Sequence, residues 1–162
     1  MGRRRKKTPV PSCYSANPST GFVSLYRDLI LSDAYMALTP KQQSLYICCC
    51  AETHGNACAD HAKATGITDP RLFYMNKELY TNKYKLYAPT DRRGPRRDLA
   101  ALVNVGLIDT VHLGFASKER NTYRLSSRWQ NYGKEGYVVP NSSKTLHMLI
   151  AEGVTSDPTE DG

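Results

Sequence analysis

Cysteine and histidine side chains are concentrated in one stretch of the sequence, residues 44–66. Within it stand Cys50, His54, Cys58 and His61, separated by three, three and two residues. Thiolate and imidazole are preferred donors of tetrahedral zinc, and a Cys₂His₂ set is one of its usual structural sites. The spacing lacks the Cys-x-x-Cys pair of the well-defined zinc motifs. A helix followed by a metal-free loop is therefore the favoured interpretation, with zinc as the alternative.

The three consecutive cysteines of this stretch divide between two sides of the helix that it predicts. At about 100° per residue, Cys48 and Cys49 fall beside Leu45, so we expect both to act as small core residues. Cys50 instead lies one turn from His54, so it is the one cysteine of the three that is a candidate metal ligand. Five cysteines are an odd number, and adjacent helical residues point apart, so reduced thiols are expected rather than disulfides.

Basic side chains are the second group of residues with a chemical use. The net charge of the chain is +7, and between residues 71 and 97 eight Lys or Arg residues stand against two acids. A basic block in a folded region, next to a basic arm, indicates nucleic acid as the partner. The basic residues expected to contact it are Arg3, Arg4, Arg5, Lys6 and Lys7 in the arm, Arg92, Arg93, Arg96 and Arg97 at a helix start, and Lys118 and Arg120 in a hairpin loop.

The first half of the sequence predicts an N-terminal arm and two helices. Residues 1–20 are rich in basic residues and proline, which indicates a disordered arm. A short strand-like entry and a first short helix follow, with Leu29 and Ile30 facing the core. A longer helix begins after Thr39, which caps it. Residues 55–70 are small and turn-forming, so we expect a connection without regular structure there.

Three short strands and a pair of helices are predicted in the second half. The strands are residues 72–74, 107–113 and 121–126, and the last two form a hairpin with a charged loop. Asn76 caps the first helix of the pair. Trp129 follows the hairpin and is expected to close the core.

The second helix of the pair combines a buried stripe with a basic start. Its stripe is Leu99, Leu102 and Val103. Gly106 is placed just past its end. Its start is either Thr90, with Pro95 in the second turn, or Gly94, with Pro95 at the first helical position. Arginines at a helix start oppose the macrodipole, and a phosphate or a guanine edge nearby would relieve that cost.

The predicted order of elements is that of a winged helix-turn-helix domain: helix, short strand, helix, turn, basic helix, strand, charged loop and strand. We therefore expect a mainly α, α+β fold over residues 21–132, with a β-hairpin wing. Residues 133–162 form a short C-terminal extension in which 144–152 can be helical and the end is acidic. Duplex DNA is the expected partner, and the protein itself, as a homodimer, is a second one.

Four pieces of the sequence carry a resemblance to a known family. They are "GFVSLYRDLILSDAYMALTPKQQSLYICCC", "LFYMNKELYTNKYKLY", "DLAALVNVGLID" and "NTYRLSSRW". Over about residues 21–132 the chain resembles the winged-helix N-terminal domains of replication initiators and replisome organisers of bacterial plasmids, phages and integrative elements. The resemblance implies a DNA-binding protein of a mobile element that acts in replication initiation or its control. A transcriptional regulator with the same DNA-binding mode is the alternative.

Other classes of function find less support in the sequence. No Gly-x-x-x-x-Gly-Lys-Ser/Thr loop, His-x-His metal motif or recognisable nucleophile triad occurs, so we expect no enzyme. An RNA-binding or metal-sensing module is a second alternative. No apolar run approaches the length of a membrane span, and no signal peptide is recognised. We expect a cytoplasmic, nucleoid-associated protein without a cofactor, unless zinc is bound.

Overall fold

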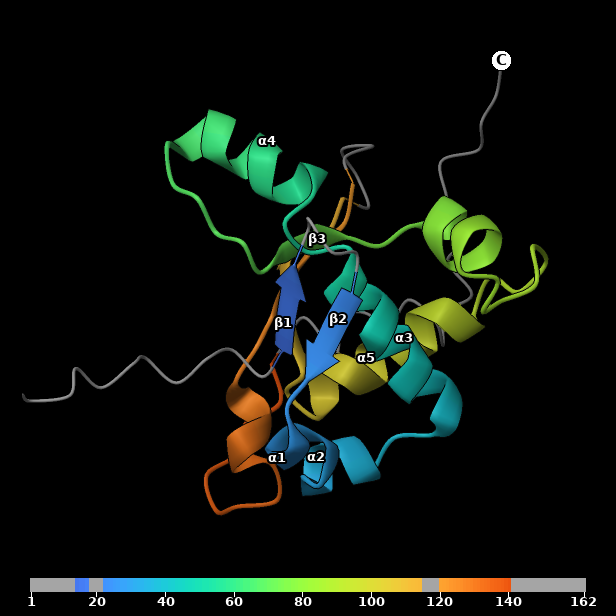
Figure 1. The fold of residues 1–162 in the computed structure, drawn as a ribbon. Helices are drawn as coiled ribbons and strands as arrows, with labels where there is room; N and C mark the ends of the chain where they lie inside the picture. The colour runs from blue at the N-terminus through green and yellow to red at the C-terminus, as the bar shows by residue number, and fades with distance from the viewer. Residues whose placement is uncertain (1–13, 18–21, 115–119, 141–162) are drawn as a thin grey trace, which may run out of the picture.

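The computed structural model describes residues 14–17, 22–114 and 120–140, which form an α+β fold (Figure 1). The elements, in chain order, are β1 (Tyr14–Asn17), β2 (Phe22–Leu25), α1 (Arg27–Ile30), α2 (Asp33–Met36), α3 (Pro40–Ala51), α4 (Asn56–Thr65), β3 (Leu72–Tyr74), the π-helix η1 (Glu78–Lys83), α5 (Gly94–Asn104), β4 (Ile108–His112), β5 (Thr122–Leu125) and the 3₁₀-helix η2 (Arg128–Asn131). Strands β3, β5 and β4 form an antiparallel sheet in that order, and β1 pairs with β2. The α+β class and the three predicted strands of the sheet are confirmed.

Helix α3 begins where the sequence predicts, at a complete capping box. The Thr39 hydroxyl accepts from the backbone N–H of Gln42 at 3.3 Å, and the Gln42 side chain accepts from the N–H of Thr39 at 3.0 Å. Two otherwise unpaired donors of the first turn are thereby satisfied. The predicted cap on the helix after β3 is confirmed too, since Asn76 accepts from the N–H of Leu79 at 3.1 Å.

Helix α4 is absent from the sequence-based prediction, which expected an irregular connection there. The segment holds four alanines among its ten residues, and alanine is the strongest helix former. Gly66, in the left-handed conformation at φ 73°, ends the helix. Only Ala57 of α4 is buried, and the helix packs mainly on β3 (Figure 1). The expectation of an irregular connection is wrong because the alanines of this segment favour a helix.

Two further expectations about the N-terminal part are wrong. Residues 14–17 form a strand rather than part of a disordered arm, because the edge of β2 pairs with them. Leu29 is fully buried as expected, but Ile30 is 40% exposed. Helix α1 is a single turn of four residues, so it can direct only one large side chain to the core.

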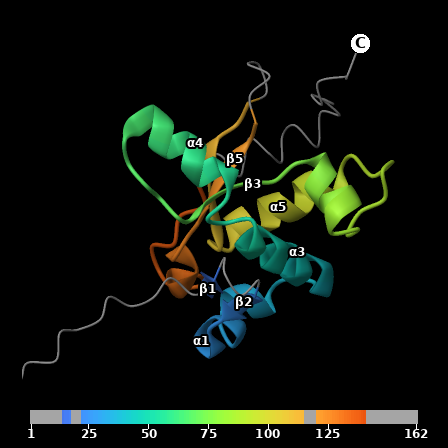
Figure 2. The ribbon, with the colours of Figure 1, turned by 45° about the horizontal axis from the view of Figure 1, so that its top comes forward.

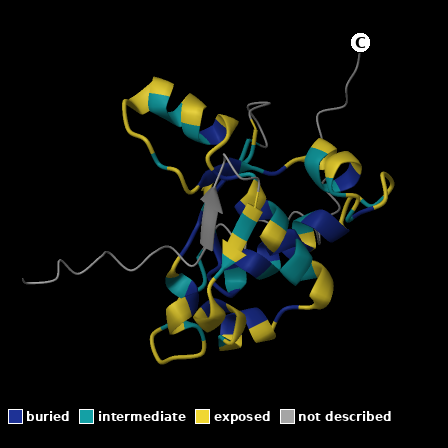
Figure 3. Ribbon diagram, viewed as in Figure 1, coloured by how far each residue is buried: buried dark blue, intermediate teal, exposed yellow. Residues whose placement is uncertain are grey.

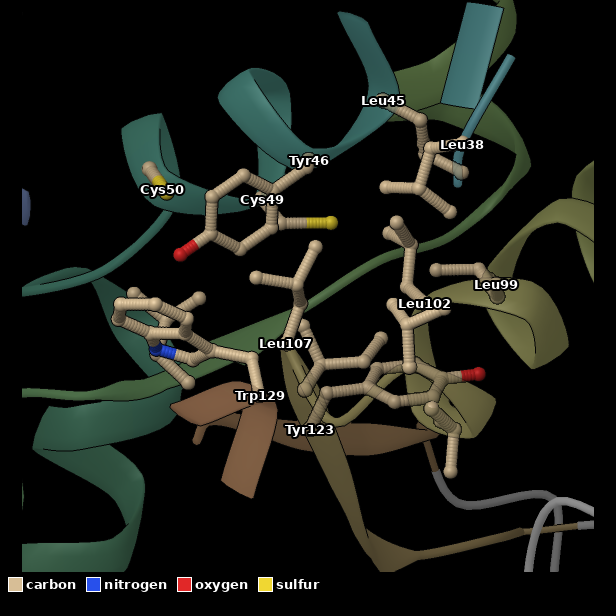
Figure 4. Close-up of a cluster of buried hydrophobic side chains, with 14 of the residues drawn as sticks. Leu38, Leu45, Tyr46, Cys49, Cys50, Leu99, Leu102, Leu107, Tyr123 and Trp129 are labelled. Atoms are coloured by element: carbon tan, nitrogen blue, oxygen red, sulfur yellow. The ribbon is translucent and has the colours of Figure 1, made fainter. Parts of the chain in front are cut away.

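The buried stripe of α5 forms the centre of the core. Leu99, Leu102 and Val103 are all buried, as predicted. Leu102 and Leu99 face Leu45 of α3 across the core, and Tyr123 of β5 closes the other side (Figure 4). Burial is densest along α5 and α3, while α4 is mostly exposed (Figure 3).

Both ends of α5 are defined by short-range contacts. The helix begins at Gly94, the second of the two predicted starts, and Pro95 is its second residue; the carboxylate of Asp91 accepts from the N–H of Gly94 at 2.7 Å. At the other end Gly106 has φ 82°. The N–H groups of Gly106 and Leu107 donate to the carbonyls of Val103 and Leu102 at 3.1 and 3.0 Å. This Schellman motif confirms the predicted helix stop.

The segment after the hairpin packs against this helix end. Trp129 of η2 is 8% exposed, as expected of a residue that closes the core. Its backbone N–H donates to the carbonyl of Gly106 at 3.0 Å. The Arg128 guanidinium pairs with Asp109 at 2.6 Å and also donates to the carbonyls of Val103 and Ile108. Helix α5, strand β4 and η2 are thus joined into one unit.

Candidate nucleic-acid interface

The predicted arginine cluster lies at the start of α5, as the sequence analysis expects. Arg92 and Arg93 are exposed in the turn before the helix, and Arg96 is half-buried in its first turn. Arg97 has a side chain that is 63% exposed. All eleven residues of α5 are described, and Arg97 is the single exposed one among them. The most exposed part of α5 is therefore its basic start.

A buried carboxylate lies directly behind this cluster. Asp98 is 2% exposed and accepts three hydrogen bonds: from the Tyr87 hydroxyl at 2.8 Å, from Gln42 Nε2 at 3.0 Å and from Arg97 Nε at 3.2 Å. These bonds join α3, the loop before α5 and α5 itself. Sequence reasoning missed Asp98, although an acid between four arginines and an apolar stripe was a visible signal.

The Asp98 cluster fixes the protonation of its partners. Burial and the hydrogen bond to Asp98 raise the pKa of the Tyr87 hydroxyl, which therefore stays protonated and donates. The hydrogen bond to Asp98 also raises the pKa of the Arg97 guanidinium. Lys41 adds a further cation, with Nζ 4.1 Å from the centroid of the Tyr87 ring. Exposed cations, Arg97 and Lys41 among them, therefore surround the buried carboxylate at the start of α5.

The predicted hairpin is present after α5. Strands β4 and β5 are antiparallel. Tyr123 of β5 is buried, which raises the pKa of its hydroxyl, and the positive charge of the nearby Arg96 opposes this rise. Tyr123, near the loop end of the hairpin, and Arg96, in the first turn of α5, therefore lie close enough for an electrostatic interaction. Figure 2 shows β5 and α5 from a second direction.

Arg120 is exposed at the end of this hairpin next to β5, as predicted. Its guanidinium lies 5.4 Å from the centroid of the Tyr74 ring, and the Tyr74 hydroxyl donates to Asp60 of α4 at 2.9 Å. Arg120 is thereby held toward β3 and α4. The other predicted contacts lie outside the described residues: Lys118 of the hairpin loop, and Arg3, Arg4, Arg5, Lys6 and Lys7 of the arm.

The candidate zinc ligands are not brought together. Cys50 is fully buried in the core, whereas His54 follows the end of α3, is exposed and has a left-handed φ of 62°. Cys58 and His61 are on α4. No group of three or more His, Cys, Asp or Glu side chains in the described part of the chain is arranged to hold a metal.

The assignment of the three cysteines is also corrected. Cys49 and Cys50 are fully buried, and Cys48 is only half-buried. The sequence predicts a core face centred on Leu45. In the structure Tyr46 is buried as well, and its ring meets the Tyr35 ring edge to face, with 6.3 Å between the ring centroids. Helix α3 is covered on two sides, so the residues one turn after Leu45 and Tyr46 both point inward.

Thiol labelling is expected to separate these cysteines. Burial, and next the Glu52 carboxylate, raise the pKa of Cys48 to about 11. Only thiolate reacts, so iodoacetamide should label Cys48 slowly at pH 7 and about tenfold faster for each pH unit up to pH 9. Cys49 and Cys50 should react only after denaturant unfolds the chain. Fragment-ion mass spectrometry locates the label, and equal labelling of Cys50 and Cys48 in the folded protein would contradict the structure.

The basic surface at the start of α5 is the candidate functional site. Among the described residues, none of the helices has the length and apolar character that crossing a bilayer requires. Comparison of the chain with protein-family models, with curated proteins and with solved structures found no match.

Proposed function

We propose that this chain is a winged helix-turn-helix protein that binds duplex DNA. The order of α3, β3, η1, α5, β4 and β5, and the sheet order β3-β5-β4, support that fold. In it, η1 and α5 serve as the helix pair and the hairpin β4–β5 as the wing. The start of α5 enters the major groove, which is wide enough for one helix.

One observation carries the proposal. The residues of helix α5 are buried or half-buried with one exception, and that exposed side chain, Arg97, is an arginine beside three others. Arginines at a helix start are unfavourable for the helix itself. A polyanion compensates for that cost, because guanidinium groups bind phosphate. Arg120 at the hairpin adds a contact to the DNA backbone.

The biological role rests on the resemblance of the sequence. A replication initiator or its control protein on a bacterial mobile element is the first candidate, and a transcriptional regulator is the second. The dimer expected from the sequence stays a prediction, as does nucleoid association. A palindromic binding site would favour a dimeric regulator, and direct repeats would favour an origin-binding protein.

Replacing Arg96 and Arg97 together with alanine is expected to weaken duplex binding by about tenfold or more, at roughly 1–3 kcal/mol per specific contact. The dependence of affinity on salt should also become shallower for each phosphate contact that is lost. A mobility-shift titration at two salt concentrations measures both effects.

The matched control is the double variant Arg27→Ala with Lys134→Ala, which removes two exposed charges from α1 and from the loop after η2. Both segments lie at the end of the molecule away from α4 (Figure 1). The control should bind like the wild type. Equal affinity of both double variants would remove α5 from the interface. Preference for single-stranded RNA of the same sequence over the duplex would favour the RNA-binding alternative.

A further inference from the structure

We infer that Arg97 is the residue of this interface that reads a base pair, through the O6 and N7 acceptors of a guanine, and that Asp98 positions it for that contact. The inference rests on the proposed binding of duplex DNA. It distinguishes one side chain that specifies sequence, Arg97, from the exposed Arg92 and Arg93, which neutralise phosphate.

The first argument is that a buried carboxylate anchors the guanidinium of Arg97. Its Nε donates to Asp98 Oδ1 at 3.2 Å, while its side chain is 63% exposed. The carboxylate cannot turn away, because Gln42 donates to the same oxygen and the Tyr87 hydroxyl donates to Oδ2. Anchoring at Nε leaves the two terminal nitrogens of the guanidinium for a partner. Those two nitrogens match the paired acceptors of guanine in the major groove.

The second argument concerns the entropy of binding. A long side chain loses rotamer freedom when it contacts a base, and a side chain that is already oriented loses less. Arg92 and Arg93 lie in the turn before α5 and are exposed. Among the described residues, no side chain anchors either of them as Asp98 anchors Arg97. They suit phosphates, which accept contacts from many directions.

The third argument concerns charge. Phosphate affinity depends on net positive charge, and Arg97 is paired with a buried carboxylate, so the pair is close to neutral. A neutral base edge loses little from that pairing, whereas a phosphate would be bound less well. Arg97 is also the fourth residue of α5, within the N-terminal part of a recognition helix that contacts base edges.

The test begins with the full-length chain and a pool of random duplexes, from which the preferred sequence is selected. Affinity is then measured for that duplex and for each of its single-base-pair variants. Three proteins are compared with the wild type: Arg97→Lys, Arg93→Lys and Asp98→Asn. Lysine keeps the positive charge but lacks the two-pronged geometry of the guanidinium. Both lysine variants alter exposed side chains and are expected to fold.

The wild type should lose about tenfold or more in affinity when one particular G·C pair is exchanged. Arg97→Lys should lose less than about twofold at that pair and keep the wild-type discrimination at the others. Arg93→Lys should discriminate like the wild type at every position. Asp98→Asn should weaken discrimination at the same G·C pair, whereas a merely structural role would lower affinity for all duplexes alike.

The possible outcomes distinguish failure of base reading by Arg97 from failure of the proposed duplex binding. Failure of the wild type to bind any duplex overturns the proposed function and the inference with it. Duplex binding without base preference, or full discrimination by Arg97→Lys at every G·C pair, overturns the inference alone. If Asp98→Asn does not fold, as judged by thermal melting, the comparison of the two lysine variants still decides whether Arg97 reads the base.

Discussion

Replacing Gly106 with alanine is expected to lower the free energy of unfolding by about 3 kcal/mol or more. The residue has φ 82°, and a left-handed conformation costs an L-residue about 1–2 kcal/mol. A Cβ atom there would also lie 2.7 Å from the backbone nitrogen of Trp129 and 2.8 Å from the carbonyl carbon of Arg128. Both neighbours are backbone atoms, so η2 as a whole would have to move.

Gly133→Ala is the matched control for this variant. Gly133 has nearly the same conformation, φ 77°, but an added Cβ would meet nothing within 4 Å. Its expected loss is the backbone cost alone, about 1–2 kcal/mol. Urea unfolding followed by the fluorescence of Trp129, the one tryptophan of the chain, measures both. Equal losses would show that the close approach of η2 to Gly106 contributes nothing.

Replacing Leu102 with alanine is expected to lower the free energy of unfolding by about 2–5 kcal/mol. Leu102 is fully buried in the middle of the cluster between α3, α5 and the sheet (Figure 4). Truncation removes apolar area from the core and leaves a cavity that the neighbouring helices can only partly fill. The lost contacts include those that hold α5 against α3.

Leu31→Ala removes the same atoms from a side chain that is 62% exposed, so its expected change is within about 0.5 kcal/mol. Comparing the two variants by urea unfolding isolates the effect of burial. Under the proposed function, Leu102→Ala should still bind duplex DNA like the wild type at a temperature where it is folded. A loss below about 1 kcal/mol for Leu102→Ala would contradict the packing of α5.

The parts of the fold that were predictable are those fixed by neighbours in sequence. The capping box at Thr39, the helix stop at Gly106 and the stripe of α5 each depend on residues within a few turns. The start of α5 was narrowed to two alternatives for the same reason. The carboxylate of Asp91, which accepts from the N–H of Gly94, favours the second of them.

The parts that were missed depend on residues distant in sequence. The sequence around Asp98 shows an unusual acid, but its role as an anchor depends on Gln42, 56 positions away, which donates to it. Cys50 is buried because Tyr35 covers the second side of α3. The spacing of residues within one helix does not reveal such a contact from another helix. The arginine cluster itself was predictable, because its signal is composition. Which arginine is anchored was not, since that depends on tertiary contacts.

The short link between α5 and β4 has a consequence for the length of a binding site. Strand β4 begins at Ile108, directly after the Schellman motif, and Arg128 ties the two elements together. Under the proposed DNA-binding mode, the helix and the hairpin cannot adjust independently to the groove. The number of base pairs between the two points of contact is then a property of the protein, constant from one target sequence to the next.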